Sequence, residues 1–184
     1  MYPIIKYRGV EIASNFSWVL QVDSVTSKAS QRLGMIKHVL FKASRKVKKV
    51  AYLTLCRPIM EYACEVWDPH LVRQITSLEN VQRKAVRFIS NLKGTQSVTE
   101  AKQFLKLELL ETRHKSARMS LMTRILTNSK LSSFIDNFKH SHNTSHNHNT
   151  RSLTNGDPPA IRSSTNFYHY SFMPRTSRNL REEP

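Results

Sequence analysis

The residues best suited to chemistry in this sequence are basic, and they gather in one stretch of the chain. Between Ser24 and Met60 there are nine basic residues and no acidic ones. They are Lys28, Arg32, Lys37, Lys42, Arg45, Lys46, Lys48, Lys49 and Arg57. A run of one sign repels itself unless a polyanion relieves it, whereas an ordinary solvated face mixes both signs. The stretch therefore predicts contact with nucleic-acid phosphates, with a solvated face or a nuclear-import signal at 44–49 as alternatives.

A second basic cluster, Arg83, Lys84 and Arg87, follows further along. Arg83 and Arg87 are four residues apart, so on a helix they share a face and could follow successive phosphates. No set of side chains suited to reading base edges accompanies them. The candidate nucleic-acid-binding residues are Arg45, Lys46, Lys48, Lys49, Arg57, Arg83, Lys84 and Arg87.

The remaining polar residues show no catalytic pattern. Metal-dependent phosphoryl transfer needs clustered carboxylates that hold two cations about 4 Å apart, and no two aspartates are adjacent here. The sequence has no P-loop and no G-x-S-x-G motif. The histidines between His140 and His148 suit adventitious metal binding better than a closed site, which needs an ordered frame. We predict a chain that is not an enzyme, with no catalytic residues, cofactor or metal.

The spacing of apolar residues predicts the helices that would carry these side chains. An amphipathic helix is expected from Asp23, and a second from Arg45 to Tyr62, bent at Pro58 because proline lacks the amide donor. The apolar residues of the second are Val47, Val50, Ala51, Thr54, Leu55 and Ile59. The third helix has the clearest period, with a stripe of Leu71, Ile75, Leu78, Val81, Ala85, Phe88 and Leu92.

Two more helices are expected after residue 96. Ser97 and Glu100 form a capping-box pattern that opens a short helix buried through Ala101, Phe104 and Leu105. A long helix follows, whose apolar face comprises Leu107, Leu110, His114, Ala117, Leu121 and Ile125. Trp67 is interpreted as a core residue rather than a base-stacking one, and Cys56 and Cys64 as reduced core residues.

The two ends of the chain differ from this helical middle. Lys6 to Ile12 is typical of a single strand, whose partners we expect to be missing from the chain because a lone strand is unstable. The His/Asn/Ser-rich residues 129–166 predict a flexible linker, and the aromatic residues 167–184 a docking tail. The predicted fold is mostly α, with one N-terminal strand and a disordered C-terminal linker.

Six sequence blocks cover nearly the whole chain. They are "YRGVEIASNFSW", "KASQRLGMI", "RPIMEYACEVWDPH", "LENVQRKAVRFI", "SVTEAKQFLKLELLETRHKSARMSLM" and "YSFMPRTSRNL". In this order they resemble the region after the catalytic palm in reverse transcriptases of LINE-type non-LTR retrotransposons, particularly the jockey and CR1-like groups. The third and fourth blocks are the most specific pair.

The resemblance implies that residues 1–22 correspond to the end of the palm and 23–128 to the helical thumb, which holds the template–primer duplex. The basic run and Arg57 would then face the nucleic-acid backbone. The residues implied to shape the thumb are Pro58, Glu61, Tyr62 and Trp67. Because Met1 falls just before the last palm strand, we expect a polymerase fragment without the catalytic aspartates. Its partner would be an RNA–DNA hybrid or a DNA duplex.

Other functions are compatible with the same sequence. The stripe from Leu71 to Leu92 could pair with another chain, as in a helical protein-interaction module, and self-association or pairing with a palm domain in trans are further alternatives. An inert gene relic is another. With no membrane span or signal peptide recognisable, an intracellular location, cytoplasmic or nuclear, is expected.

Overall fold

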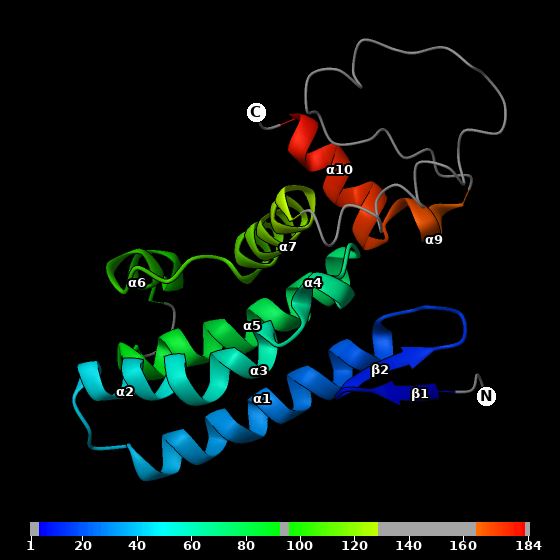
Figure 1. Ribbon diagram of the computed structural model, residues 1–184. Coiled ribbons are helices and arrows are strands. Elements are labelled where there is room, and N and C mark those ends of the chain that lie inside the picture. Colours follow the sequence, from blue (N-terminus) through cyan, green and yellow to red (C-terminus); the bar gives the residue numbers. More distant parts are fainter. Residues whose placement is uncertain (1–3, 93–95, 129–164, 183–184) are drawn as a thin grey trace, which may run out of the picture. The chain divides into compact units, whose positions relative to one another are not determined.

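The computed structural model describes residues 4–92, 96–128 and 165–182. The chain divides into two compact units, Met1–His114 and Lys115–Pro184. The described residues are mostly helical, with one small two-stranded sheet near the N-terminus, so the predicted helical fold class is confirmed (Figure 1). All but the last two residues of the predicted linker lie outside the described residues.

The N-terminal residues form a hairpin rather than a single strand. Strands β1 (Ile4–Tyr7) and β2 (Val10–Ala13) pair antiparallel, with Tyr7 opposite Val10. Arg8 and Gly9 make the turn, both with positive φ, at 46° and 84°. Two-residue hairpin turns need such backbone angles to match the twist of the strands. The expectation of one strand without a partner is therefore wrong, because Gly9 is the turn and not part of a strand.

Helix α1 (Val19–Val39) begins four residues before the predicted start at Asp23. Its first turn is held by β2, because the Glu11 amide donates to Oε1 of Gln21 at 2.8 Å. Beyond that turn, the three- and four-residue spacing of Val25, Ala29, Leu33 and Ile36 predicts the buried face correctly, whereas Leu40, at the same spacing, is half-buried at the C-cap. The buried apolar residues of α1 are Val22, Val25, Ala29, Leu33 and Ile36. Tertiary contact with the hairpin thus extends the helix past its sequence cap.

The predicted bent helix is divided into three parts: α2 (Arg45–Ala51), a π-helical turn η1 (Tyr52–Cys56) and α3 (Arg57–Glu61). Pro58 lies in the first turn of α3, where its missing amide hydrogen is tolerated. The irregularity therefore lies before the proline, in η1, and not at the proline itself. A short helix, α4 (Cys64–Trp67), follows.

The helix α2–η1–α3 buries a different face from the predicted one. Val47, Val50 and Leu55 are 48%, 54% and 52% exposed. The core instead receives Lys48, Tyr52, Cys56 and Met60. Residues four apart drift by roughly 40° per step on a regular α-helix. The wider π turn offsets this drift, so all four side chains point the same way.

Helix α5 (Val72–Ile89) packs against both α1 and α2 and completes the core of the first unit (Figure 1). Its predicted stripe is buried at Leu78, Val81 and Ala85, with 2%, 3% and 0% exposure. Val86 and Ile89 are also buried, whereas Leu71 is 48% exposed. The middle of the stripe is therefore intramolecular core, which removes the surface on which pairing of this stripe with another chain would rest.

Helix α6 (Val98–Phe104) begins at the predicted cap, where the Ser97 hydroxyl accepts from the Glu100 amide at 3.4 Å. The predicted burial of Phe104 is wrong, because its side chain is 70% exposed. Leu105 is buried as predicted, and so is Leu107. The two leucines lie on either side of Lys106, whose positive φ of 51° turns the chain. The reversal directs the apolar residues inward after the helix has ended.

The second unit contains most of α7 (Leu110–Thr127) together with α9 (Asn166–His169) and α10 (Phe172–Glu182). Met122 and Met173 form a small buried cluster, against which Ile125, Leu126, Phe172 and Leu180 pack. The guanidinium of Arg118, which is 2% exposed, donates to Thr176 and Asn179 at 3.3 Å each. These contacts join α7 to α10 within this unit.

Candidate nucleic-acid interface

The outward face of α5 carries the most continuous basic surface among the candidate residues. Arg73, Arg83 and Lys84 are exposed and Arg87 is half-buried. At about 100° per residue, the four fall within an arc of roughly 100° that is centred opposite the buried face. They extend over about 21 Å of helix axis at 1.5 Å per residue. Arg73 was not among the candidates because it precedes the cluster by ten residues.

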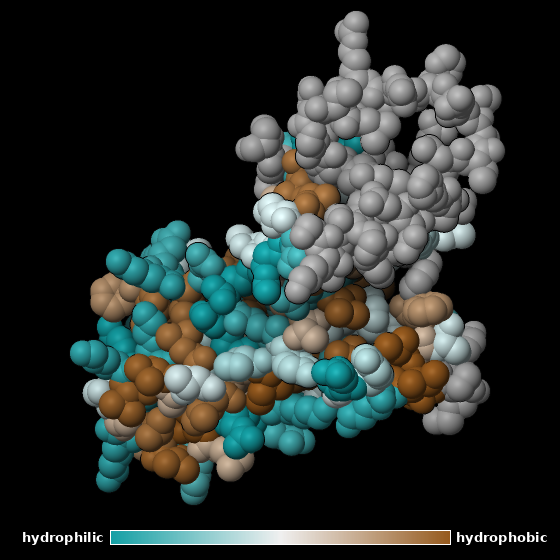
Figure 2. All heavy atoms as spheres, viewed as in Figure 1, coloured by the Kyte–Doolittle hydropathy of each residue, from teal (hydrophilic) through white to brown (hydrophobic). Residues whose placement is uncertain are grey.

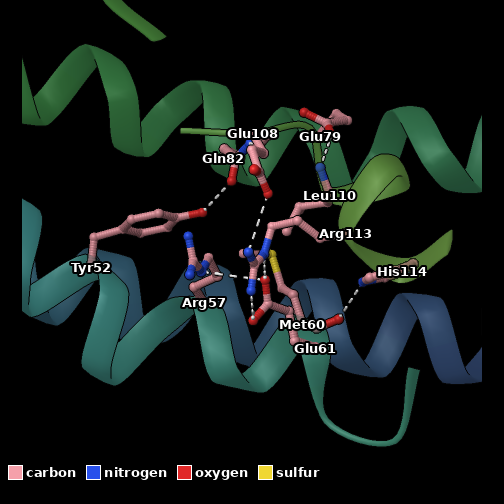
Figure 3. Close-up of polar contacts among 10 residues, drawn as sticks. All are labelled: Tyr52, Arg57, Met60, Glu61, Glu79, Gln82, Glu108, Leu110, Arg113 and His114. Atoms are coloured by element: carbon pink, nitrogen blue, oxygen red, sulfur yellow. Dashed lines mark hydrogen bonds and ion pairs between the residues drawn. The ribbon is translucent and has the colours of Figure 1, made fainter. Parts of the chain in front are cut away.

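The single acidic residue of α5, Glu79, does not weaken this basic face. Its carboxylate forms an ion pair with Lys102 Nζ at 2.9 Å and accepts a hydrogen bond from the Leu110 amide. Both partners come from the segment that includes α6 and the start of α7, and Figure 3 shows the contact of Glu79 with Leu110. The carboxylate is thus neutralised on the flank of α5, and the outward face keeps its positive charge.

The basic residues of α2 occupy a separate position. Arg45 and Lys46 are exposed and Lys49 is half-buried. The guanidinium of Arg45 lies over the ring of Phe104 in α6, 5.4 Å from the ring centroid, within the range of a cation–π interaction. Because α6 contacts α2 through this pair and α5 through Lys102 and Glu79, it lies at the junction of the two basic helices.

Lys48 differs from its neighbours, because it is buried with only 2% exposure. Its Nζ donates to Oδ1 of Asn91 at 2.8 Å and lies 4.7 Å from the centre of the Phe88 ring. The ammonium group is therefore engaged at the packing of α2 on α5. This position argues against a role of Lys48 on a phosphate backbone, although sequence spacing could not distinguish it from Lys46 and Lys49.

Arg57 is also engaged inside the chain. Its Nε lies 3.3 Å from Oε1 of Glu61, and its side chain is 20% exposed. Glu61 in turn binds Arg113, which also lies 3.3 Å from Glu108 (Figure 3). The hydrogen bonds that Arg113 donates to the Glu61 carboxylate raise the pKa of Arg113 above its ordinary value. Arg57 thus belongs to a charge network that holds the segment before α7 against α3.

A buried polar chain fixes the same segment to the helical core. Oη of Tyr52 donates to Oε1 of Gln82 at 2.8 Å, and Nε2 of Gln82 donates to the Glu108 carbonyl at 2.7 Å (Figure 3). Gln82 is fully buried. Sequence reasoning missed it, although it shares a helical face with Leu78 and Val86, where a polar residue must find partners.

His114 completes the attachment of this segment. Its Nδ1 lies 3.2 Å from Oδ1 of Asp68 and its Nε2 lies 3.0 Å from the Met60 carbonyl. Trp67 packs edge-on against the imidazole, with ring centroids 5.4 Å apart, and its Nε1 donates to the Tyr62 carbonyl at 2.8 Å. Trp67 is fully buried, so the predicted core role is confirmed and stacking on a base would require the core to open.

The two cysteines are free and buried, as predicted. Burial raises the pKa of the Cys56 thiol to about 11 and that of Cys64 to about 12. The Cys56 thiol donates to the Ala29 carbonyl at 3.4 Å. Both groups are therefore poor nucleophiles, because the thiolate is the reactive form.

Comparison with protein-family models, curated proteins and solved structures gives no match. None of the helices in the described part of the chain is long and apolar enough to cross a membrane. Within residues 4–92, 96–128 and 165–182, no three His, Cys, Asp or Glu side chains gather as a metal site would require.

Proposed function

We propose that this chain binds the phosphate backbones of double-stranded nucleic acid without sequence specificity, and that it derives from the thumb region of a LINE-type reverse transcriptase. The single observation that carries the binding proposal is the basic outward face of α5. The derivation rests on the six sequence blocks that resemble that family. We propose binding without catalysis, because the catalytic aspartates of a polymerase have no counterpart in this sequence.

The size and charge of the α5 face suit a nucleic-acid backbone. About 21 Å of helix corresponds to roughly six base pairs at 3.4 Å rise per strand. Four cations over that length can neutralise several phosphates, and each neutralised phosphate releases condensed counterions. A formal net charge of +16 adds long-range attraction for any polyanion.

The residues assigned to this function differ from the full candidate set. Arg83, Lys84 and Arg87 form the main contact, together with Arg73. Exposed residues of α2, Arg45 and Lys46 with the half-buried Lys49, form a second region of contact. Lys48 and Arg57 are left out, because their charged groups are engaged within the chain. Arginine and lysine contacts of this kind position a duplex but carry no sequence information.

The proposal can be tested by fluorescence anisotropy with a labelled RNA–DNA hybrid and the matching DNA duplex over a salt series. Each phosphate contact contributes about 0.9 to the slope of log K against log salt for B-DNA. Replacing Arg83, Lys84 and Arg87 by glutamine should therefore reduce the magnitude of the slope by about 2.7 and weaken binding at low salt.

The matched control removes the same charge from other exposed positions, Lys6, Lys106 and Arg124. This control changes the net charge equally, so it should retain most of the slope if location matters. Equal losses in the two triple variants would contradict an α5 interface and leave only nonspecific attraction to a basic protein. A slope near zero for the wild-type chain would contradict nucleic-acid binding altogether.

A further inference from the structure

The apolar residues of α2–η1–α3 that the core does not use form an exposed groove. One hollow, of about 400 Å³, is lined by Lys46, Val47, Val50 and Ala51. A second, of about 430 Å³, is lined by Arg32, Thr54, Leu55, Pro58, Ile59 and Tyr62. The lining residues recur every three or four positions from 46 to 62, so the two hollows follow one side of the same helical segment.

This apolar surface is left uncovered because α2 buries a lysine and exposes its valines. An amphipathic surface helix normally buries its aliphatic residues and exposes its lysines. Here Lys48 is buried, while Val47 and Val50 face solvent. Figure 2 shows the resulting apolar surface over α2 and the C-terminal end of α1. Contiguous exposed apolar surface of this kind marks an interaction site more often than an isolated exposed residue does.

Helix α1 borders the groove at the second hollow. Arg32 lines the second hollow, and residues at three- and four-residue spacing from it share its face. These are Lys28, Met35 and Val39, all exposed. Met35 and Val39, 59% and 76% exposed, extend the apolar surface toward α2. The groove thus has an aliphatic floor and a border on α1 that is basic at one end and apolar at the other.

The charge around the groove has one sign. Arg32 lines the second hollow and Lys46 the first. Lys28 is exposed one turn before Arg32 on α1, and the exposed Lys42 lies in the connection between α1 and α2. No acidic residue occurs between positions 24 and 60. The occupant that complements an aliphatic floor with a positive rim is an amphipathic helix whose apolar face is flanked by carboxylates.

We propose that the groove between α1 and α2–η1–α3 binds an acidic amphipathic helix of a partner protein. From position 46 to 62 the groove is about 24 Å long, which accommodates about 16 residues of helix. A second copy of this chain fits poorly, since each copy carries a formal charge of +16. Residues 129–164 fit poorly too, because they contain four basic and only two acidic residues.

The groove and the basic face of α5 lie on different sides of the first unit, whereas Lys46, in the second region of nucleic-acid contact, also lines the groove. Helix α5 contacts both α1 and α2 through its buried face, and its basic arc lies on the opposite side of the helix. A duplex on α5 would therefore leave the groove open. A nucleic acid in the groove itself would leave its polar backbone against aliphatic side chains, unlike the polar and charged surfaces typical of such interfaces. The two proposals can thus succeed or fail independently.

The test uses the full chain and a fluorescein-labelled helical peptide of about 18 residues. The peptide carries leucines at i, i+4, i+7 and i+11 with glutamates on both flanks. Binding should weaken by about tenfold or more when Val50 and Leu55 are both changed to glutamate. The matched control places glutamates at Ile5 and Val72, which are 69% and 78% exposed. All four positions are exposed, so circular dichroism and the urea midpoint should stay at wild-type values.

A charge exchange provides the second arm. Changing Lys28 and Arg32 to glutamate should weaken binding of the acidic peptide. The same change should strengthen binding of an otherwise identical peptide that carries lysines in place of glutamates. Equal affinity of the two peptides for the wild-type chain, or equal loss in the groove and control variants, would overturn the proposal. So would absence of peptide binding while phosphatidylserine vesicles or a DNA duplex bind in a manner that depends on Val50 and Leu55.

Discussion

Replacing Gln82 by leucine should destabilise the first unit strongly, although leucine has nearly the same size. Burial raises the pKa of Tyr52 far above its ordinary value, so the phenol keeps its proton and needs an acceptor. Without Gln82, the buried hydroxyl and the Glu108 carbonyl both lose a partner. Each such loss costs about 1–3 kcal/mol, and water can reach exposed Glu108. The expected cost is therefore about 2–4 kcal/mol.

Urea denaturation followed by far-ultraviolet circular dichroism measures this cost. With m about 2 kcal/mol/M, the midpoint should fall by about 1–2 M. Removing the phenol as well, in a Tyr52→Phe and Gln82→Leu double variant, should cost about 1 kcal/mol less than the sum of the single changes. Gln31→Leu, at an exposed position of α1, should stay within about 0.5 kcal/mol of wild type. Strict additivity of Tyr52 and Gln82 would refute the coupling inferred here.

Three further outcomes are expected. In Lys48→Met, the slope of log K against log salt for duplex binding should stay within about 0.3 of the wild-type slope, since a true phosphate contact contributes about 0.9. A decrease of about 0.9 in the magnitude of the slope would show that Lys48 contacts a phosphate. His114→Ala should lower the free energy of unfolding by about 3 kcal/mol, because it removes one partner of a buried pair with Asp68, and a urea midpoint equal to wild type would contradict that. Cys56 and Cys64 should resist iodoacetamide at pH 8 until urea unfolds the chain. Their folded pKa values of about 11 and 12 lie above the ordinary 9.0. The contribution of the two protonated thiols to the free energy of unfolding is therefore fully present below about pH 9, and it is lost as the pH rises toward their folded pKa values. Fast alkylation of the native protein would contradict their burial.

Much of the helical framework could be predicted from local patterns. The stripe through Leu78, Val81 and Ala85 lies in the core, and Ser97 caps its helix as its pattern indicated. Such features depend on residues within one or two turns of each other, which a single sequence displays directly. The basic excess is equally local, because net charge does not depend on the fold. The four-residue spacing of Arg83 and Arg87 likewise predicts a shared helical face from the sequence alone.

Other features depend on contacts between distant segments. The hairpin holds the start of α1 through the hydrogen bond from the Glu11 amide to Gln21. At the turn around Lys106, Leu105 and Leu107 are buried while Phe104 is exposed. Gln82 joins residues 30 and 26 positions away from it in the chain. The local periodicity of apolar residues carries no information about such distant partners, so the polar network could not be predicted from spacing.

Local spacing and composition make α2–η1–α3 amphipathic and basic, but its packing against α1 and α5 selects the side that faces inward. Tyr52 and Met60 bring large side chains to the core, and Tyr52 finds an acceptor in Gln82. Lys48 finds Asn91 and the Phe88 ring. These partners offset the burial of polar groups, while the π turn keeps the four-residue spacing aligned. The valines are consequently left outside, where the positive charge and the apolar surface of the chain meet.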